Sequence, residues 1–178
     1  DLNIPIKTDS NNSREITVEE LLAQYFQPES LTGDNKYRCG VCQDACDAKR
    51  SHFLSKLPLV LNLQLARYIF DMKTFRKQKL LNKILLPKSL ELDVKDTGDV
   101  KYILCAIQNH KGGSAHTGHY IAEVMDWSTG SWYEFDDDNV SFLEHDPKST
   151  YDPIKARESK VKLKGGNPDA YNLFYVPE

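Results

Sequence analysis

The sequence lacks the features that would assign it at once to a membrane, nucleic-acid or secreted class. Its longest apolar stretches, such as residues 57–61, are far shorter than the roughly 20 residues that a spanning helix needs. Basic residues are not in excess, since 23 Lys and Arg stand against 26 Asp and Glu, with a net charge of −3. We therefore expect neither a membrane nor a nucleic-acid partner.

No signal-peptide pattern opens the chain, which begins at Asp1 rather than Met, and we expect it to be an excised part of a longer protein. Only four cysteines are present, and three of them, Cys39, Cys42 and Cys46, lie within eight residues. The fourth, Cys105, stands in an apolar stretch. A secreted disulfide framework would spread its cysteines along the chain, so this distribution predicts a reducing compartment, cytoplasmic or nuclear.

What is present indicates an α+β domain built on an antiparallel sheet. Thr17 and Glu20 form a capping-box pattern, which predicts a short amphipathic helix that ends near Pro28. Leucines alternate with other residues over 57–66, which is the period of a strand. Further strand candidates are residues 2–6, 68–70, 84–86, 90–94, 102–107, 119–125, 131–135 and 171–176. Many strands with hairpin-length turns and few helices favour this fold class.

Two polar segments interrupt the strands. Residues 146–170 are rich in Lys, Asp, Pro and Gly and are predicted to be a mobile insertion. The other segment follows residues 68–70 and is basic. It is predicted to be the solvated tip of a hairpin, with its charged side chains in water; these are Lys73, Arg76, Lys77 and Lys79.

The spacing of His119 and the aspartates suggests that a hairpin brings a carboxylate into contact with the imidazole. Residues 126–130 have turn composition, and a turn centred near Ser128 would pair residues whose numbers sum to about 256. His119 and Tyr120 would then face Asp136 and Asp137, with paired Cβ atoms roughly 5 Å apart. The hairpin alone would bring a carboxylate to the imidazole.

Such a pair supports several chemistries. A carboxylate that accepts from one ring nitrogen fixes the tautomer and leaves the other nitrogen to take a proton from a nucleophile. An ordinary surface salt bridge would have the same spacing. Metal binding by residues 136–139 is the weaker alternative, because the Gly and distal Glu of a calcium loop are missing. Three glycines, Gly112, Gly113 and Gly118, lie in the loop before the histidine and would let a substrate backbone approach.

Six blocks of the chain, in order, resemble the ubiquitin-specific proteases, which are papain-like cysteine hydrolases that cut after the C-terminal glycine of ubiquitin. The blocks are residues 37–42, 57–68, 102–110, 118–122, 132–137 and 170–176. Within the family the chain is most similar to the ubiquitin-specific protease 48 group, particularly over residues 61–71. The resemblance implies the papain-like fold, a thiol mechanism that requires no cofactor, and ubiquitin and ubiquitinated proteins as partners.

The resemblance also implies roles for individual residues. His119 would be the general base, Asp136 would orient it, and Asp137 would assist. Gly118, Tyr120, Tyr68 and His110 would contact the ubiquitin tail, with residues 111–118 closing over it. Residues 1–56 would form the fingers region, 57–145 the palm with the His and Asp, and 171–178 its final strand.

The cysteines complete the family pattern only in part. Cys39 and Cys42 would be half of a structural zinc knuckle whose other pair lies outside the chain. Cys46 or His52 could replace the missing ligands, but neither has a persuasive spacing. Cys105 has the surroundings of a core residue, so we expect no nucleophile in these 178 residues. The chain alone would then be inactive. The alternative is a non-catalytic ubiquitin-binding module.

Overall fold

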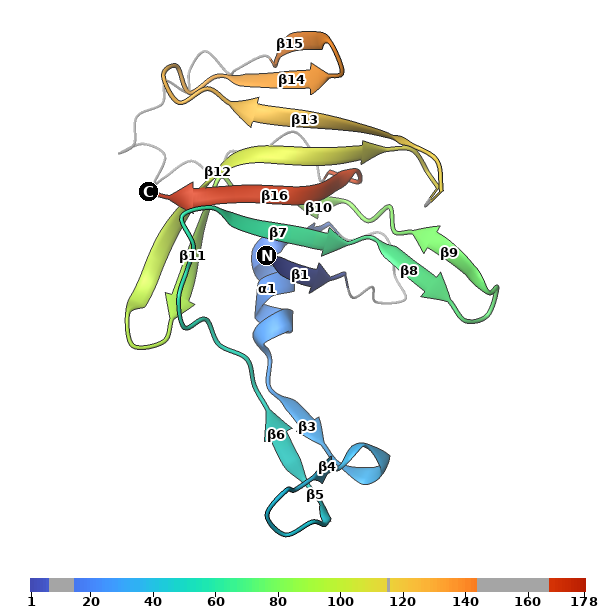
Figure 1. The fold of residues 1–178 in the computed structure, drawn as a ribbon. Coiled ribbons are helices and arrows are strands. Elements are labelled where there is room, and N and C mark those ends of the chain that lie inside the picture. Colours follow the sequence, from blue (N-terminus) through green and yellow to red (C-terminus); the bar gives the residue numbers. More distant parts are fainter. Residues whose placement is uncertain (7–14, 115, 144–166) are drawn as a thin grey trace.

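The computed structural model describes residues 1–6, 15–114, 116–143 and 167–178, and one large sheet dominates it (Figure 1). The sheet has eight strands, in the order β1-β7-β16-β12-β13-β14-β15, with β11 also paired to β12. All pairs in it are antiparallel except β1 with β7. The strands are β1 (Leu2–Pro5), β7 (Leu61–Ala66), β11 (Ser89–Val94), β12 (Gly98–Lys111), β13 (His119–Met125), β14 (Trp132–Asp136), β15 (Asn139–Leu143) and β16 (Ala170–Pro177).

Strand β12 organises the sheet because it pairs with three others. At 14 residues it is longer than the 102–107 stretch predicted from its apolar run. Its first half pairs with β11, its second half with β13, and its other edge with β16. The ladder with β16 shifts register beside Cys105, between Leu104 and Ala106.

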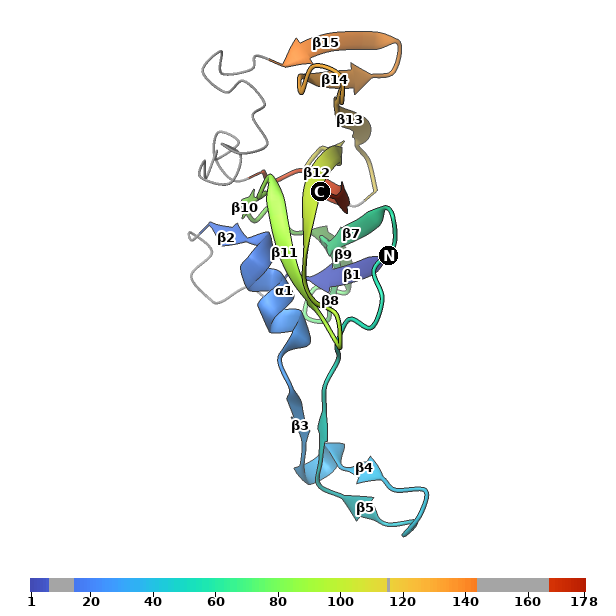
Figure 2. The ribbon, with the colours of Figure 1, turned by 90° about the vertical axis from the view of Figure 1, so that its left-hand side faces the viewer.

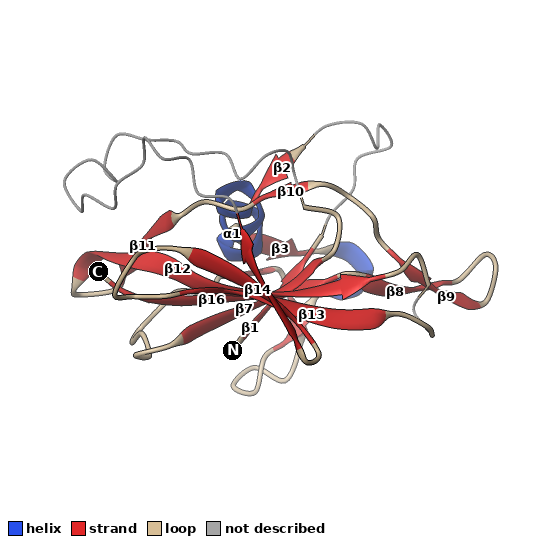
Figure 3. Cartoon of the chain, turned by 90° about the horizontal axis from the view of Figure 1, so that it is seen from above, coloured by secondary structure: helices blue, strands red, loops and turns tan. Residues whose placement is uncertain are grey.

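The single α-helix of the described residues, α1 (Val18–Phe26), lies on one face of the sheet (Figure 3). Its predicted capping box is confirmed, since the Glu20 amide donates to Thr17 Oγ1 at 3.1 Å and the Thr17 amide donates to Glu20 Oε2 at 3.3 Å. Val18, Leu21 and Leu22 point into the core, where they join buried residues of the sheet. Burying this apolar stripe stabilises the helix far more than its propensity does.

The alternation predicted over 57–66 is only partly a strand, because β7 begins at Leu61. Leu61, Leu63 and Leu65 are buried as alternation requires, but Leu59 is 85% exposed. The ladder with β16 starts at Leu61 opposite Tyr175, so the residues before it have no neighbouring strand to pair with in the sheet. The alternation of leucines thus begins at residue 57, four residues before the strand itself.

Small hairpins project from the sheet at two places. Strands β8 (Tyr68–Asp71) and β9 (Arg76–Lys79) form the predicted hairpin after β7. At the far end of the molecule, β3 (Glu29–Leu31) pairs with β6 (Ala48–Arg50), and β4 (Tyr37–Arg38) pairs with β5 (Ala45–Cys46), around the short 3-10 helix Gly33–Asn35 (Figures 1 and 2). Strands β2 (Ile16–Thr17) and β10 (Ile84–Leu85) form a further parallel pair.

Two features fall outside the sequence-based picture. Strand β15 was not anticipated, although residues 139–142 alternate polar and apolar side chains; all four are exposed, so this alternation marks no buried face. Most of the expected insertion, residues 146–166, lies outside the described residues. Within the described residues, no helix is long and apolar enough to cross a membrane.

Candidate active site

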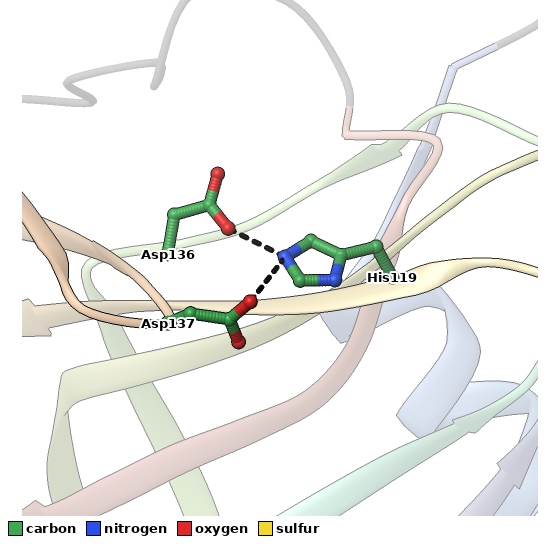
Figure 4. Close-up of side chains that lie close together, drawn as sticks. All are labelled: His119, Asp136 and Asp137. Atoms are coloured by element: carbon green, nitrogen blue, oxygen red, sulfur yellow. Dashed lines mark hydrogen bonds and ion pairs between the residues drawn. The ribbon is translucent and has the colours of Figure 1, made fainter.

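His119 is the first residue of β13, Asp136 is the last residue of β14, and the two side chains meet (Figure 4). His119 Nε2 lies 2.5 Å from Asp136 Oδ1 and 3.9 Å from Asp137 Oδ2. The His119 and Asp136 side chains are about half exposed, at 47% and 49%. The pair therefore lies at the surface, where a substrate can reach it.

The hairpin does bring base and carboxylate together, but its register differs by one from the prediction. The ladder runs from Met125 opposite Trp132 to Ala122 opposite Phe135, so paired numbers sum to 257 rather than 256. His119 lies beyond the last rung, and Asp136 is its diagonal neighbour rather than a direct partner. The predicted facing of His119 and Asp137 is wrong, and the shorter contact is with Asp136.

The contact fixes which ring nitrogen stays available. Asp136 occupies Nε2, so Nδ1 is the nitrogen left to exchange a proton with a reacting group. The hydrogen bond to Asp136, with the charges of Asp136 and Asp137, raises the pKa of His119 above its ordinary value. Asp137 stands in the turn between β14 and β15 with a φ of +49°, and its side chain is 80% exposed. It adds negative charge rather than a second short bond.

An aromatic cluster lies beside the histidine and contains the other predicted site residues. Tyr68 packs edge-on against His110, with ring centroids 5.7 Å apart, and His110 packs on Tyr120 at 4.7 Å. Tyr171, which sequence reasoning missed, joins Tyr68 and Tyr120 at 5.5 and 6.2 Å. Burial raises the pKa of Tyr68 to about 12, with help from a hydrogen bond to Tyr120.

Gly118 packs directly on the ring of His110. A Cβ at position 118 would collide with that ring and lie 2.6 Å from the Lys111 carbonyl oxygen, so no side chain fits there. His110 is buried, and its Nδ1 atom has no hydrogen-bond partner among the described residues. The structure thus brings Gly118, Tyr120, Tyr68 and His110 together, as a shared binding surface requires.

Two buried cations beside this cluster were missed. Arg67 is fully buried between β7 and β8 and donates to four backbone carbonyls, those of Leu80, Asn82, Asn167 and Ala170. Lys79, predicted to be solvated, is also buried and contacts Asp169. The solvated assignment is wrong for Lys79 only, because Lys73, Arg76 and Lys77 are exposed. The only signal in the sequence was the position of each cation next to apolar residues.

Cys105 is poorly placed to act with His119. His119 pairs with Lys111, six residues along β12 from Cys105, which is about 20 Å at the usual rise of a strand. The Cys105 thiol donates to the Phe174 carbonyl at 3.2 Å, and burial raises the pKa of this thiol. A raised pKa and a distant position both argue against a nucleophile.

The remaining thiols lie on the β4–β5 hairpin, at the opposite end of the molecule from β13–β15 in both side views (Figures 1 and 2). Cys42 Sγ and Cys46 Sγ are 3.5 Å apart, and backbone N–H groups of Cys42 and Val41 lower the pKa of Cys39. The lowered pKa of Cys39 suits a metal-binding thiol, whereas the hydrogen bond with Cys42 raises the pKa of Cys46. However, a tetrahedral zinc site needs four ligands, and the described residues place only these three thiols on the hairpin.

Within the described residues, the one group of three that could hold an ion is the site itself. The ligand atoms of His119, Asp136 and Asp137 all lie within 4.8 Å of one another. Two of them already share a hydrogen bond, and an ion would have to displace it. The arrangement is therefore better suited to an oriented base than to a metal ligand set.

Comparison with known proteins accounts for this arrangement. The sequence model of the family described as ubiquitin carboxyl-terminal hydrolase matches residues 6–175. Ubiquitin carboxyl-terminal hydrolase 26 of Oryza sativa subsp. japonica is 42% identical over 129 residues, which are 71% of this chain and 12% of that protein. Ubiquitin carboxyl-terminal hydrolase 48 of Gallus gallus is 35% identical over 168 residues, 88% of this chain and 16% of that protein.

A solved structure of the SAGA DUB module bound to monoubiquitin contains a similar chain. It has a TM-score of 0.73 and 30% identity, and covers 100% of this chain and 35% of that one. The present chain thus spans a small part of each relative's length. Since the family match extends over nearly all of its residues, the chain belongs to the ubiquitin carboxyl-terminal hydrolase family.

Proposed function

We propose that this chain carries the general base of a deubiquitinating thiol protease. The complete protein would hydrolyse the bond after the C-terminal glycine of ubiquitin, in the cytoplasm or nucleus. One observation carries the proposal: Asp136 holds His119 through Nε2, which leaves Nδ1 free at the exposed beginning of β13. An imidazole held in this way can take a proton from a thiol and later return it to a leaving amine.

The catalytic steps follow from that geometry. A thiol S–H transfers its proton to His119 Nδ1, and the thiolate attacks the carbonyl carbon of the scissile bond. The protonated imidazole then gives its proton to the departing amine, leaving a thioester that water hydrolyses. Asp136 stabilises the imidazolium throughout, in agreement with the raised pKa of His119, and Asp137 adds negative charge nearby. We propose that the thiol comes from outside this chain, since Cys105 is distant and the other cysteines lie on the β4–β5 hairpin.

The aromatic cluster supports ubiquitin as the partner. Tyr68, His110 and Tyr120, with Gly118, form a surface on which an extended tail without side chains would pack. Gly118 has no side chain and lies on the His110 ring, so an extended tail can approach its backbone closely. The structural relative bound to monoubiquitin is a further reason to expect this partner.

The activity is tested with the complete protein and ubiquitin bearing a fluorescent leaving amine. His119→Ala should lower turnover by about 10²- to 10⁴-fold, the usual contribution of a positioned general base. It should leave the dissociation constant for ubiquitin unchanged. His52→Ala is the matched control, because His52 is exposed and packs on Tyr25, far from β13 in the chain's topology. Retained turnover in His119→Ala would refute the proposal.

The same experiment distinguishes the alternative, a non-catalytic ubiquitin-binding module. That alternative predicts ubiquitin binding without turnover in the unmodified complete protein. The observation in its favour is that none of the described cysteines is placed to attack beside His119. Sequencing the upstream coding region for a cysteine box would give an independent answer.

We also propose that Cys39 and Cys42 supply two ligands of a structural zinc in the complete protein. The positive φ of Gln43, +59°, turns the chain after Cys42 and brings Cys46 back toward it. The sulfur atoms of Cys42 and Cys46 are 3.5 Å apart, close to the roughly 3.8 Å between thiolates on one tetrahedral zinc, and a side-chain hydrogen bond joins Cys39 to Cys42. Zinc content per molecule, compared between the unmodified protein and Cys39→Ser, tests this proposal.

We further propose a division of the chain into regions. Residues 1–56 would be the fingers region, residues 57–145 the palm, and residues 171–178 the last strand of the palm.

A further inference from the structure

Lys79, the last residue of β9, is the starting point because its charged group is completely buried. Its side chain has 0% exposure, although the other basic residues of the β8–β9 hairpin are in solvent. Its Nζ donates to the His110 carbonyl at 2.5 Å, to the Gly112 carbonyl at 2.7 Å and to Asp169 Oδ1 at 3.0 Å. An ammonium group has three N–H donors, and all three are used here.

Burial of an ammonium ion is costly unless a counter-charge and good hydrogen bonds accompany it. Asp169 supplies the counter-charge, and the two carbonyls supply the remaining acceptors. A fully satisfied ionic group of this kind fixes local geometry, because any other arrangement would leave the buried ammonium group without its acceptors and counter-charge. Lys79 therefore constrains the backbone to which it donates.

That backbone leads into the candidate active site. His110 and Lys111 are the last residues of β12, and Gly112 begins the connection to β13 with a φ of +125°. The connection ends at Gly118, which packs on the His110 ring directly before His119. Lys79 thus fixes the beginning of this connection, and the ring of His110 supports its end.

The charge of Lys79 also affects the pKa of His110. Burial, followed by the nearby charge of Lys79, lowers the pKa of His110, and Asp169 opposes the shift. The ring also faces Tyr68 and Tyr120, and its Nδ1 atom has no partner among the described residues. The ring is enclosed by these neighbours, so it supports the backbone of Gly118 and the ring of Tyr120 from below rather than facing solvent.

We infer that Lys79 and Asp169 are positioning residues that hold the backbone at His110 and Gly112, so that Gly118 and Tyr120, supported by the buried His110 ring, present a preformed surface to the C-terminal glycines of ubiquitin. The inference rests on the proposed function for the identity of the substrate. It adds two residues that lie outside the general base and its carboxylate. Pre-organisation of this kind lowers the ordering cost of binding.

The test measures how much the two terminal glycines add to affinity. The complete protein and its Lys79→Met variant are titrated with ubiquitin and with ubiquitin that lacks its last two residues. We expect the unmodified protein to bind the full tail more tightly and Lys79→Met to lose most of that difference. In turnover of a ubiquitin–amine substrate, KM should rise about 10- to 100-fold, a scale that small misplacements reach. A variant with altered overall stability alone would not change the tail-dependent difference.

Lys77→Met is the matched control, because Lys77 is exposed on the same strand. Asp169→Asn is the second variant, and it decides the question if circular dichroism shows that Lys79→Met is unfolded. A folded Lys79→Met or Asp169→Asn with the tail dependence of Lys77→Met would overturn the inference. If His119→Ala keeps full turnover, only the proposed function fails, because the tail-dependent affinity is measured without catalysis.

Discussion

Replacement of Arg67 by Met should cause a large loss of stability. The guanidinium is fully buried and donates to the carbonyls of Leu80 at 2.9 Å, Asn82 at 3.0 Å, Asn167 at 2.8 Å and Ala170. Met fills much of the stem's volume, so the change removes the donors while leaving little cavity.

The magnitude follows from the acceptors that are left. The bonds to Asn82 and Ala170 are buried, whereas those to Leu80 and Asn167 are partly buried and can recover water. At about 1–3 kcal/mol for each buried acceptor left unpaired, the two buried carbonyls cost about 2–6 kcal/mol. Relief from burying the charge, whose cost lowers the pKa of Arg67 to about 10, offsets part of this. We expect a net loss of about 3 kcal/mol, a large share of a typical free energy of unfolding.

Urea unfolding followed by circular dichroism measures this loss, with Arg50→Met as the matched control. Arg50 donates to a carboxylate, that of Glu29 at 2.6 Å, and the two side chains are 60% and 47% exposed. A surface pair of this kind contributes about 0–1 kcal/mol. If Arg67→Met were no more destabilising than Arg50→Met, the argument from unpaired carbonyls would be refuted.

Three further predictions concern single contacts. His119 titrates above its ordinary pKa of 6.5, so its stabilising contribution is complete below that value and is lost as pH rises through the folded-state pKa. NMR titration should show a lower pKa in Asp136→Asn, and an unchanged value would contradict the hydrogen bond as its main cause. Gly118→Ala should cost about 1–3 kcal/mol by overpacking against His110 and weaken ubiquitin binding; calorimetry showing wild-type affinity would count against this. Thr17→Ala should lower the free energy of unfolding by about 1 kcal/mol through loss of the helix cap, and a variant as stable as the parent would exclude that role.

The sequence allowed prediction of elements whose determinants are local. Thr17 and Glu20 are three residues apart, so the start of α1 could be inferred from a short pattern. The β13–β14 hairpin was inferred from turn composition, and Asp126 indeed accepts from Ser128 and Thr129 within that turn. Its register could not be inferred, because the ladder ends at Met125 opposite Trp132 and leaves one more residue in the loop than expected.

The errors concern contacts between distant parts of the chain. Lys79 finds its partners 31, 33 and 90 residues away, so nothing near it in the sequence marks it as buried. Tyr171 joins the aromatic cluster only because β16 lies between β7 and β12. The family resemblance grouped His110, Tyr68 and Tyr120 from the sequence, and the structure places them together; periodicity alone could not have done so.

The backbones of His119 and Asp136 are held by different numbers of neighbouring strands. His119 is anchored through its backbone to Lys111 on β12, the strand with neighbours on both edges, whereas Asp136 pairs only with Asn139 across a tight turn at the outer end of the sheet. A change in the β14–β15 turn would therefore move the carboxylate while the imidazole stayed in place. Basicity at Nδ1 thus depends on the geometry of a turn that contains neither the base nor any residue of β12.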